Sequence, residues 1–269
     1  MSTIEAIDGG QVNDGAAQVY EQFFVPALFQ EWPAHIITAA KVQSGQRVLD
    51  VACGTGVLTR ELARAVGDSA QVDAIDINDN MLAVARQLCS NVNWRNAAAE
   101  TLPFTNSIYD VTTCQFGLMF FTDRRQALIE MWRVLKPGGK LVIAVWDSIE
   151  KSPGYATLSS LLHKLFGDPA LRAISAPYNL GDKKLLRELL AAANITNYDI
   201  TTLAGTARFP SLAAWMHTEI RGWTLADLID DRQFEQLLEQ SQTVLRGFVG
   251  NDGTVSFAAP AHIITATKA

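Results

Sequence analysis

Residues 48–56 read V-L-D-V-A-C-G-T-G, an apolar strand that ends in a carboxylate and is followed by a turn of small residues. A helical pattern begins directly after the turn, at Val57. This order of strand, turn and helix is what a chain needs to lay its backbone against a nucleoside ligand. The segment therefore favours a chain built from alternating strands and helices, with a ligand at the end of the first strand.

The turn lacks the third glycine of a dinucleotide-binding loop. The G-x-G-x-x-G fingerprint requires a glycine where the helix packs on its strand, and that position, counted from Gly54 and Gly56, is Thr59. A second acid, Asp76, ends the next apolar run, at the separation where an acid reaches ribose hydroxyls. Two carboxylates without a phosphate-binding loop favour a nucleoside that carries no phosphates. A nicotinamide oxidoreductase, the alternative enzyme class, fits this pattern poorly.

Strands and helices alternate between Arg47 and Trp146. The patterns predict strands over 47–51, 71–75, 92–95, 109–114 and 140–146 and helices over 57–66, 79–88 and 123–135. Helical patterns over 16–29 and 32–42, which should break or begin at Pro26 and Pro33, precede them. A further helix covers 182–193, and strands follow over 198–203 and 263–267. This alternation predicts a parallel sheet with helices on both faces, which binds ligands at the carboxyl ends of its strands.

Two segments lie outside the alternation. Residues 151–180 contain several prolines around one amphipathic helix, and residues 210–247 are helical in pattern. We interpret both as insertions that form a lid over the crevice. Residues 1–150 would then hold the leading helices and the cofactor-binding half, and residues 151–269 the lid insertions and closing strands of the same domain.

These motifs together resemble a known family. The runs D-V-A-C-G-T-G, A-I-D-I-N-D-N-M-L, A-A-A-E-T-L-P-F, S-I-Y-D-V and R-V-L-K-P-G-G-K-L-V-I stand in this order. They resemble a class I S-adenosylmethionine-dependent methyltransferase of the ubiquinone/menaquinone-biosynthesis-like (methyltransferase type 11) group. The resemblance implies an α/β fold, with a Rossmann-like, seven-stranded, mostly parallel sheet that ends in an antiparallel strand pair. It also implies S-adenosyl-L-methionine as the cofactor.

The resemblance implies methyl transfer to an oxygen, nitrogen or carbon atom of an acceptor, and the apolar, aromatic lid segments favour a small, partly hydrophobic acceptor. A non-catalytic cofactor-binding or regulatory protein on the same fold stays open, because fold does not fix function. Methyl transfer from a sulfonium is an in-line displacement with an activated leaving group, so the protein mainly positions the reactants and excludes water. We accordingly assign no catalytic residue from the sequence, and no metal site.

The cofactor site follows from the resemblance, motif by motif. Asp50 would lie near the methionine amino group and accept backbone N–H bonds from the turn, and Asp76 would accept both ribose hydroxyls. Ala98 stands where relatives usually have an aspartate that binds the adenine amine, so that contact is either absent here or supplied by Glu100 or a main-chain carbonyl. The predicted cofactor-binding residues are Tyr20, Asp50, Ala52, Cys53, Gly54, Thr55, Gly56, Asp76, Ile77, Met81, Ala98, Ala99, Glu100 and Gln115.

Local conformation gives further expectations. Gly54 and Gly56 allow a positive φ. Ala52 occupies a position where many relatives have glycine, and alanine is tolerable there only if φ stays negative. The alternative role for Asp76 is that of a turn acid that caps the helix over 79–88, and Asp79 competes for that cap.

Aromatic and apolar residues near the predicted crevice give a candidate substrate pocket, although several could equally be core residues. Its members are Trp32, Phe116, Met119, Trp146, Tyr178, Trp215 and His217.

Composition limits the partners. The net charge of −6 argues against nucleic acid, because phosphate binding requires a clustered basic surface. No run of 18 apolar residues predicts a membrane span. Three cysteines, all expected to be buried, give no disulfide or zinc framework and favour a reducing cytoplasmic compartment. Buried cysteines also make arsenic methylation a poor fit. The oligomeric state is not determined by these patterns.

Overall fold

The computed structural model describes residues 14–67, 71–221, 225 and 228–269. Its main sheet has seven strands in the order β3-β2-β1-β4-β5-β9-β6. Their bounds are β1 (Val48–Val51), β2 (Val72–Asp76), β3 (Asn93–Asn96), β4 (Tyr109–Gln115), β5 (Leu135–Trp146), β6 (Tyr198–Leu203) and β9 (Ala261–Thr267). All neighbours are parallel except β9, which runs antiparallel to both β5 and β6. The predicted sheet, with its antiparallel closing pair, is confirmed.

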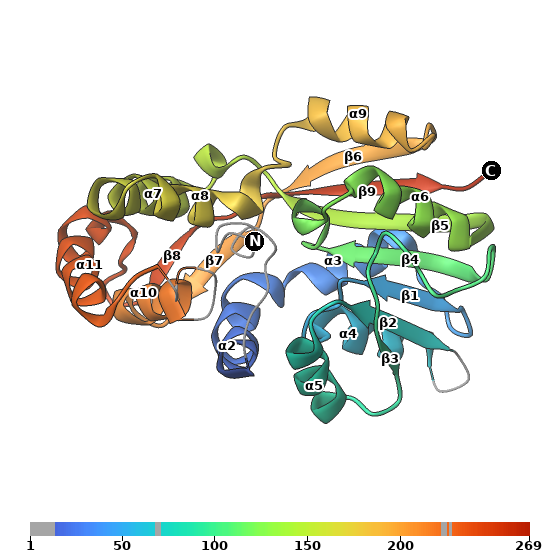
Figure 1. Cartoon of the computed structure of the whole chain (residues 1–269), viewed down its shortest axis with the longest axis horizontal. Helices are drawn as coiled ribbons and strands as arrows, with labels where there is room; N and C mark the ends of the chain where they lie inside the picture. The colour runs from blue at the N-terminus through green and yellow to red at the C-terminus, as the bar shows by residue number, and fades with distance from the viewer. Residues whose placement is uncertain (1–13, 68–70, 222–224, 226–227) are drawn as a thin grey trace.

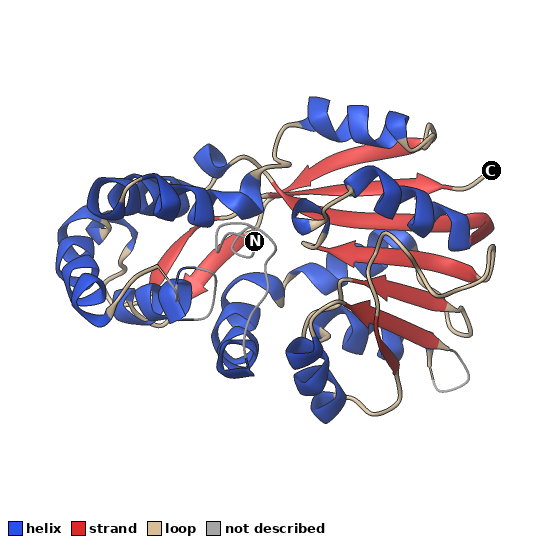
Figure 2. Ribbon diagram, viewed as in Figure 1, coloured by secondary structure: helices blue, strands red, loops and turns tan. Residues whose placement is uncertain are grey.

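Helices cover both faces of this sheet (Figures 1 and 2). They are α3 (Trp32–Ala40), α4 (Val57–Val66), α5 (Asp79–Leu88), α6 (Arg124–Val134) and α9 (Lys183–Ala192). Helices α4 and α5 have the predicted bounds, because glycine or asparagine marks their starts and an apolar stripe every three to four residues marks their buried faces. The fourth parallel strand crosses over beside β1, so the strand order reverses between these two strands.

The sequence predicts ordinary helix over 16–29, with a break or a new start at Pro26. This segment is instead a short helix, α2 (Asp14–Val19), continued by a π-helix, η1 (Tyr20–Phe29), that contains Pro26. Proline has no N–H for the ordinary helical ladder, and π-helical turns are often found at functional sites. Phe24 and Phe29 of η1 are buried, and the segment lies between the sheet and the remaining helices (Figure 1).

Residues after β5 form a helical layer beyond the carboxyl ends of the parallel strands (Figure 1). The layer contains α7 (Pro153–Phe166), α8 (Asp168–Ser175), α10 (Leu212–Arg221) and α11 (Asp231–Val244). The prediction of one helix within 151–180 was wrong, because Gly167, with a φ of 76°, ends α7 and starts α8. A two-stranded sheet of β7 (Thr206–Phe209) and β8 (Val255–Ala258) was also missed, since four-residue strands carry little pattern.

The two layers share one hydrophobic core, which contains two groups of aromatic rings. Trp32 of α3 is fully buried, and its ring contacts those of Phe116 and Trp146 edge to face. On the other side, Tyr155 of α7 packs against Trp215 and Phe257. None of the described helices is long and apolar enough to span a bilayer.

Candidate functional site

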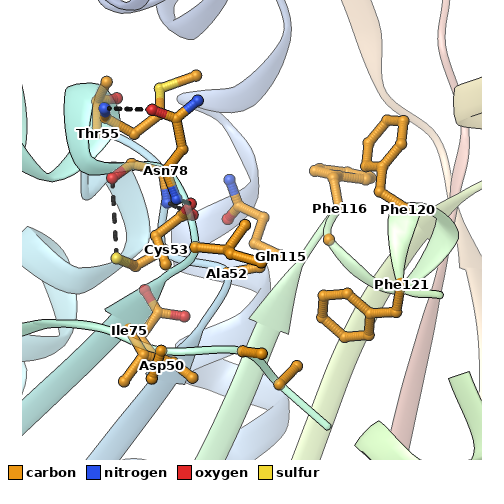
Figure 3. Close-up of a pocket in the computed structure, with 18 of the residues that line it drawn as sticks. Asp50, Ala52, Cys53, Thr55, Ile75, Asn78, Gln115, Phe116, Phe120 and Phe121 are labelled. Carbon is orange, nitrogen blue, oxygen red and sulfur yellow. Dashed lines mark hydrogen bonds between the residues drawn. The ribbon is translucent and has the colours of Figure 1, made fainter. Parts of the chain in front are cut away.

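A cavity of about 230 Å³ opens at the carboxyl ends of β1, β2 and β4. All the predicted cofactor residues except Gly56 line it. Figure 3 shows this wall, with Asp50, Ala52 and Cys53 on one side and Phe116, Phe120 and Phe121 on the other. Residues that the prediction did not include complete the lining: Val57, Leu58, Ile75, Asn78, Ala97, Gly117, Phe120, Phe121 and Thr122.

Asp50 is buried at the end of β1 and accepts two hydroxyl hydrogen bonds. Thr59 Oγ1 donates at 2.6 Å and Thr113 Oγ1 at 2.9 Å. The expectation that backbone N–H groups bind this carboxylate was therefore wrong. Thr59 occupies the third-glycine position, and its side chain contacts the acid directly. Burial raises the pKa of Asp50 to about 7, and the negative charge of Asp76 adds to this, although both threonine hydrogen bonds oppose it.

Asp76 joins the two turns of the cavity. Its Oδ2 accepts the Gly54 N–H at 2.8 Å, and its Oδ1 accepts the Asn78 N–H at 2.8 Å. Burial raises the pKa of this carboxyl, and the backbone hydrogen bonds oppose the shift. The alternative that Asp76 or Asp79 caps α5 was wrong. The cap is Asn78, whose side chain accepts the N–H groups of two residues in the first helical turn.

The turn after β1 runs through the left-handed region of backbone conformation. Ala52 has a φ of 56°, so the expectation of a negative φ was wrong. Gly54 and Gly56 have φ values of 55° and 88°, as expected. Gly56 does not line the cavity, and a Cβ added there would lie 2.5 Å from the Trp94 ring. The turn therefore has a conformation that is unfavourable for residues other than glycine. Asp76 stabilises this conformation by accepting the Gly54 N–H.

The outer wall comes from β2 and the segment after β3. Ile77 is 58% exposed although it is apolar, and it lines the cavity. Ala98 and Ala99 lie beside it with Glu100, whose Oε1 accepts the N–H groups of Thr122 and Asp123 at 3.1 and 3.3 Å. Glu100 therefore fixes the start of α6 and has one carboxylate oxygen engaged.

The charge of this cavity has one sign. Its ionisable carboxylates are Asp50, Asp76 and Glu100, and none of the described residues that line it is basic. Two lining side-chain oxygens, Thr55 Oγ1 and Gln115 Oε1, are buried without a hydrogen-bond partner. The cavity suits a ligand that carries positive charge and hydrogen-bond donors, and it disfavours phosphates.

A second cavity, of about 60 Å³, adjoins the first and shares Tyr20, Phe116 and Phe120 with it. Its remaining lining residues come from η1, β5 and both lid segments: Phe24, Leu28, Phe29, Trp146, Tyr155, Ala173, Ile174, Pro177, Tyr178, Glu219 and Leu225. Phe116, with a φ of 55°, stacks on Trp146 with the ring centroids 3.9 Å apart. The second cavity is therefore largely aromatic where the first is acidic.

Three of the seven residues predicted for the substrate pocket line the second cavity, and four do not. Phe116, Trp146 and Tyr178 line the second cavity. Trp32, Met119 and Trp215 do not: each is buried behind the cavity wall as core. His217 is exposed and contacts the Phe23 ring edge to face.

Glu219 is the residue that the sequence reasoning missed. It is 5% exposed, and its Oε1 accepts the Tyr155 hydroxyl at 2.5 Å and the Trp215 Nε1–H at 3.2 Å. Residues two apart lie on opposite faces of a helix, while residues four apart share one, so Glu219 faces inward with Trp215 and His217 does not. An acid four residues after a tryptophan in an apolar helix was the available signal. Burial raises the pKa of Glu219 to about 7.

The cysteines do not supply a nucleophile to the first cavity. Burial raises the pKa of the Cys53 thiol well above its ordinary value and that of Cys114 to about 12. The expectation that all three are buried was wrong for Cys89, which is partly exposed, with its Sγ 2.9 Å from Asn91 Oδ1.

A seven-stranded sheet with an antiparallel closing pair, and an acidic cavity at the carboxyl ends of its first two strands, define a class I S-adenosylmethionine-dependent methyltransferase. The model of the ubiE/COQ5 methyltransferase family matches residues 24–159. The chain belongs to this family.

Two curated relatives and one solved structure illustrate the similarity. The ubiquinone/menaquinone biosynthesis C-methyltransferase UbiE of Serratia proteamaculans is 34% identical over 190 residues, which are 65% of this chain and 76% of the relative. That of Shewanella halifaxensis is 45% identical over 122 residues, 43% of this chain, so the chain spans about half (49%) of that relative's length. The YcgJ protein of Bacillus subtilis shares the fold, with a TM-score of 0.61, 22% identity and coverage of 88% of this chain and 98% of its own.

Proposed function

We propose that this protein transfers the methyl group of S-adenosylmethionine to a small, largely apolar acceptor bound in the aromatic cavity. The observation that carries this proposal is the junction of two chemically different cavities at Tyr20, Phe116 and Phe120. An acidic cavity at a nucleoside-binding position meets an aromatic one there. A donor in the first and an acceptor in the second would face each other across these three rings.

The residues of the first cavity fit the cofactor. S-adenosylmethionine has an ammonium and a sulfonium and no phosphate, so three carboxylates without a lining base suit it. Asp76 would bind the ribose hydroxyls, and the partnerless oxygens of Thr55 and Gln115 would accept hydrogen bonds from the amino acid part. When bound, the cofactor supplies a methyl group on a leaving group that is already activated.

The protein's contribution to the reaction is positioning and exclusion of water. Phe116 is fixed by stacking on Trp146, and Tyr20 stacks on Phe29, so the junction has rigid walls. Rigid apolar walls hold the acceptor atom at attack distance and keep water from competing. Holding two reactants in line can account for about 7 kcal/mol or more of the barrier.

The acceptor is set by the C-terminal part of the chain. The curated relatives are named as C-methyltransferases of ubiquinone and menaquinone biosynthesis. Here Ala173, Ile174, Tyr178, Glu219 and Leu225 of the cavity lie outside the region that the family model matches. A cavity of about 60 Å³ admits a compact ligand, on the scale of one small ring. We therefore infer a ring-sized acceptor specific to this chain.

Titration calorimetry with S-adenosylhomocysteine tests the cofactor assignment. We expect binding by the wild type, a loss on the order of 100-fold in Asp76→Ala, and a loss of less than about 10-fold in Glu100→Ala, since two charge-assisted hydrogen bonds outweigh one. Circular dichroism would check that both variants fold. Equal losses would contradict the ribose assignment, and no binding to folded wild type would contradict the proposed function.

A further inference from the structure

Glu219 brings a carboxylate into a cavity whose other walls are aromatic or aliphatic. It comes from α10, within the segment 210–247, and lines the same cavity as the rings at the junction with the cofactor cavity. Among the described residues that line this cavity it is the one with a formal charge, and none is basic. The other titratable groups that line this cavity are Tyr20, Tyr155 and Tyr178, and burial raises the pKa of all three hydroxyls above the ordinary value.

The hydrogen bonds of Glu219 leave half of the carboxylate free. Tyr155 Oη and Trp215 Nε1 both donate to Oε1, and no other described side chain or backbone group is recorded as donating to this carboxylate. A buried carboxylate without a cationic partner is costly, because burial disfavours the charged form. Oε2 is therefore available for a positively charged group that enters the cavity.

Aromatic faces are a second attraction for a cation. The cavity walls include Phe24, Phe29, Phe116, Phe120, Trp146 and Tyr178. Ring faces attract an ammonium ion electrostatically, and the attraction is stronger when water is excluded. A carboxylate combined with several ring faces is the complement of an organic ammonium ion, and a neutral hydroxyl compound would use only part of it.

We propose that Glu219 is a catalytic residue and that the methyl acceptor is a small amine, which binds as its ammonium ion and transfers a proton to Glu219. This inference rests on the proposed function, because it assigns the acceptor of the same reaction.

The proton transfer activates the nucleophile. The ammonium N–H bond breaks, its proton bonds to Glu219 Oε2, and the electron pair stays on nitrogen. The nitrogen lone pair then bonds to the methyl carbon while the carbon–sulfur bond breaks, and that electron pair stays on sulfur. The new ammonium product leaves, and Glu219 releases its proton to water. Charge and atoms balance without another reactant.

The apolar surroundings favour this transfer for an amine more than for a phenol. An ammonium and a carboxylate become two neutral groups, so the cost of two buried charges is relieved. A phenol would only move the negative charge from the carboxylate to the phenolate. A pKa of about 7 for Glu219 also makes it a proton acceptor matched to neutral pH.

The test compares benzylamine with benzyl alcohol, its neutral counterpart of the same size. Calorimetry on the full chain saturated with S-adenosylhomocysteine should show benzylamine binding at least 10-fold more tightly than the alcohol. Glu219→Gln should abolish this preference and leave the affinity for S-adenosylhomocysteine within about 2-fold of wild type. His217→Gln, the matched control on the same helix, lies outside the cavity and should keep the preference.

Methylation assays on benzylamine, N-methylbenzylamine and phenol complete the test. We expect transfer to the amines, a Glu219→Gln rate lower by about 100-fold or more, and loss of the acidic limb of the pH–rate profile in that variant. Equal binding of benzylamine by wild type and Glu219→Gln, or methylation of phenol but of neither amine, would overturn the proposal. If S-adenosylhomocysteine itself did not bind, the proposed function would fail first, and the two failures would be distinguishable.

Discussion

The cofactor half and the acceptor half of this molecule are built in different ways. The acidic cavity comes mainly from the turns after β1, β2 and β3 and from the end of β4, which follow one another between residues 50 and 122. The aromatic cavity takes its walls from η1, β5, α7, α8 and α10, which span most of the chain. Because the first cavity is built from turns that are close together in the sequence, it depends on the backbone conformation of those turns. The second depends on side-chain packing between segments that are far apart in the sequence.

The two halves also differ in where their strain and charge lie. In the first, backbone strain lies at Ala52, an alanine with a positive φ, beside the carboxylates of Asp50 and Asp76. In the second, the charge lies on Glu219, a carboxylate buried among rings. Substitutions in the turn after β1 should therefore act through conformation, and substitution of Glu219 through protonation.

Gly56→Ala should produce the largest loss of stability. Its φ of 88° is unfavourable for alanine by about 1–2 kcal/mol, and the new Cβ would lie 2.5 Å from the Trp94 ring, which adds about 1–3 kcal/mol of overpacking. Urea unfolding should give a total loss of about 2–5 kcal/mol. Gly54→Ala is the control: its φ is 55° but the nearest atom is 4.0 Å away, so about 1–2 kcal/mol is expected. Equal losses would show that the ring contact does not matter.

Glu219→Gln should change how stability depends on pH. The pKa of Glu219 is about 7 in the folded protein and 4.5 ordinarily, so the folded state binds its proton more tightly. As pH rises from about 4.5 to 7, the unfolded chain ionises first and wild type loses stability. Relative to wild type, the variant should gain about 3 kcal/mol between pH 4 and pH 8. Thermal melts across this range measure the difference, and parallel curves for the two proteins would contradict the buried-carboxylate account.

Ala52→Gly should give the smallest effect, a gain in stability. Glycine adopts a φ of 56° without the steric cost that alanine has, although it gains entropy in the unfolded chain. The net change should be about 0.5–1 kcal/mol in favour of folding, measured by urea unfolding. A loss of stability would mean that the methyl group of Ala52, which lines the cofactor cavity, contributes more by packing than its backbone conformation costs.

The comparison also explains what the sequence could predict. The sequence could predict helices α4 and α5 and the cofactor residues around Asp50 and Asp76. The signals for them, namely the spacing of apolar residues, glycines in turns and acids at strand ends, each lie within a few residues of the feature that they predict. The partners of Asp50 were not, since Thr113 lies on a different strand. The acceptor cavity was predictable only as a set of aromatic residues, because tertiary packing decides which of them face the cavity. Trp215 and His217 of α10, for example, do not line it.

A structure of the protein with S-adenosylhomocysteine bound tests the central claim most directly. The account predicts the ribose at Asp76 and the sulfur atom at the junction formed by Tyr20, Phe116 and Phe120, so that it faces the cavity containing Glu219. Helices α7, α8 and α10 should cover that junction. A sulfur atom directed to open solvent, with the aromatic cavity closed off from it, would contradict the division of the molecule into a cofactor half and an acceptor half and would leave a macromolecular acceptor as the better explanation.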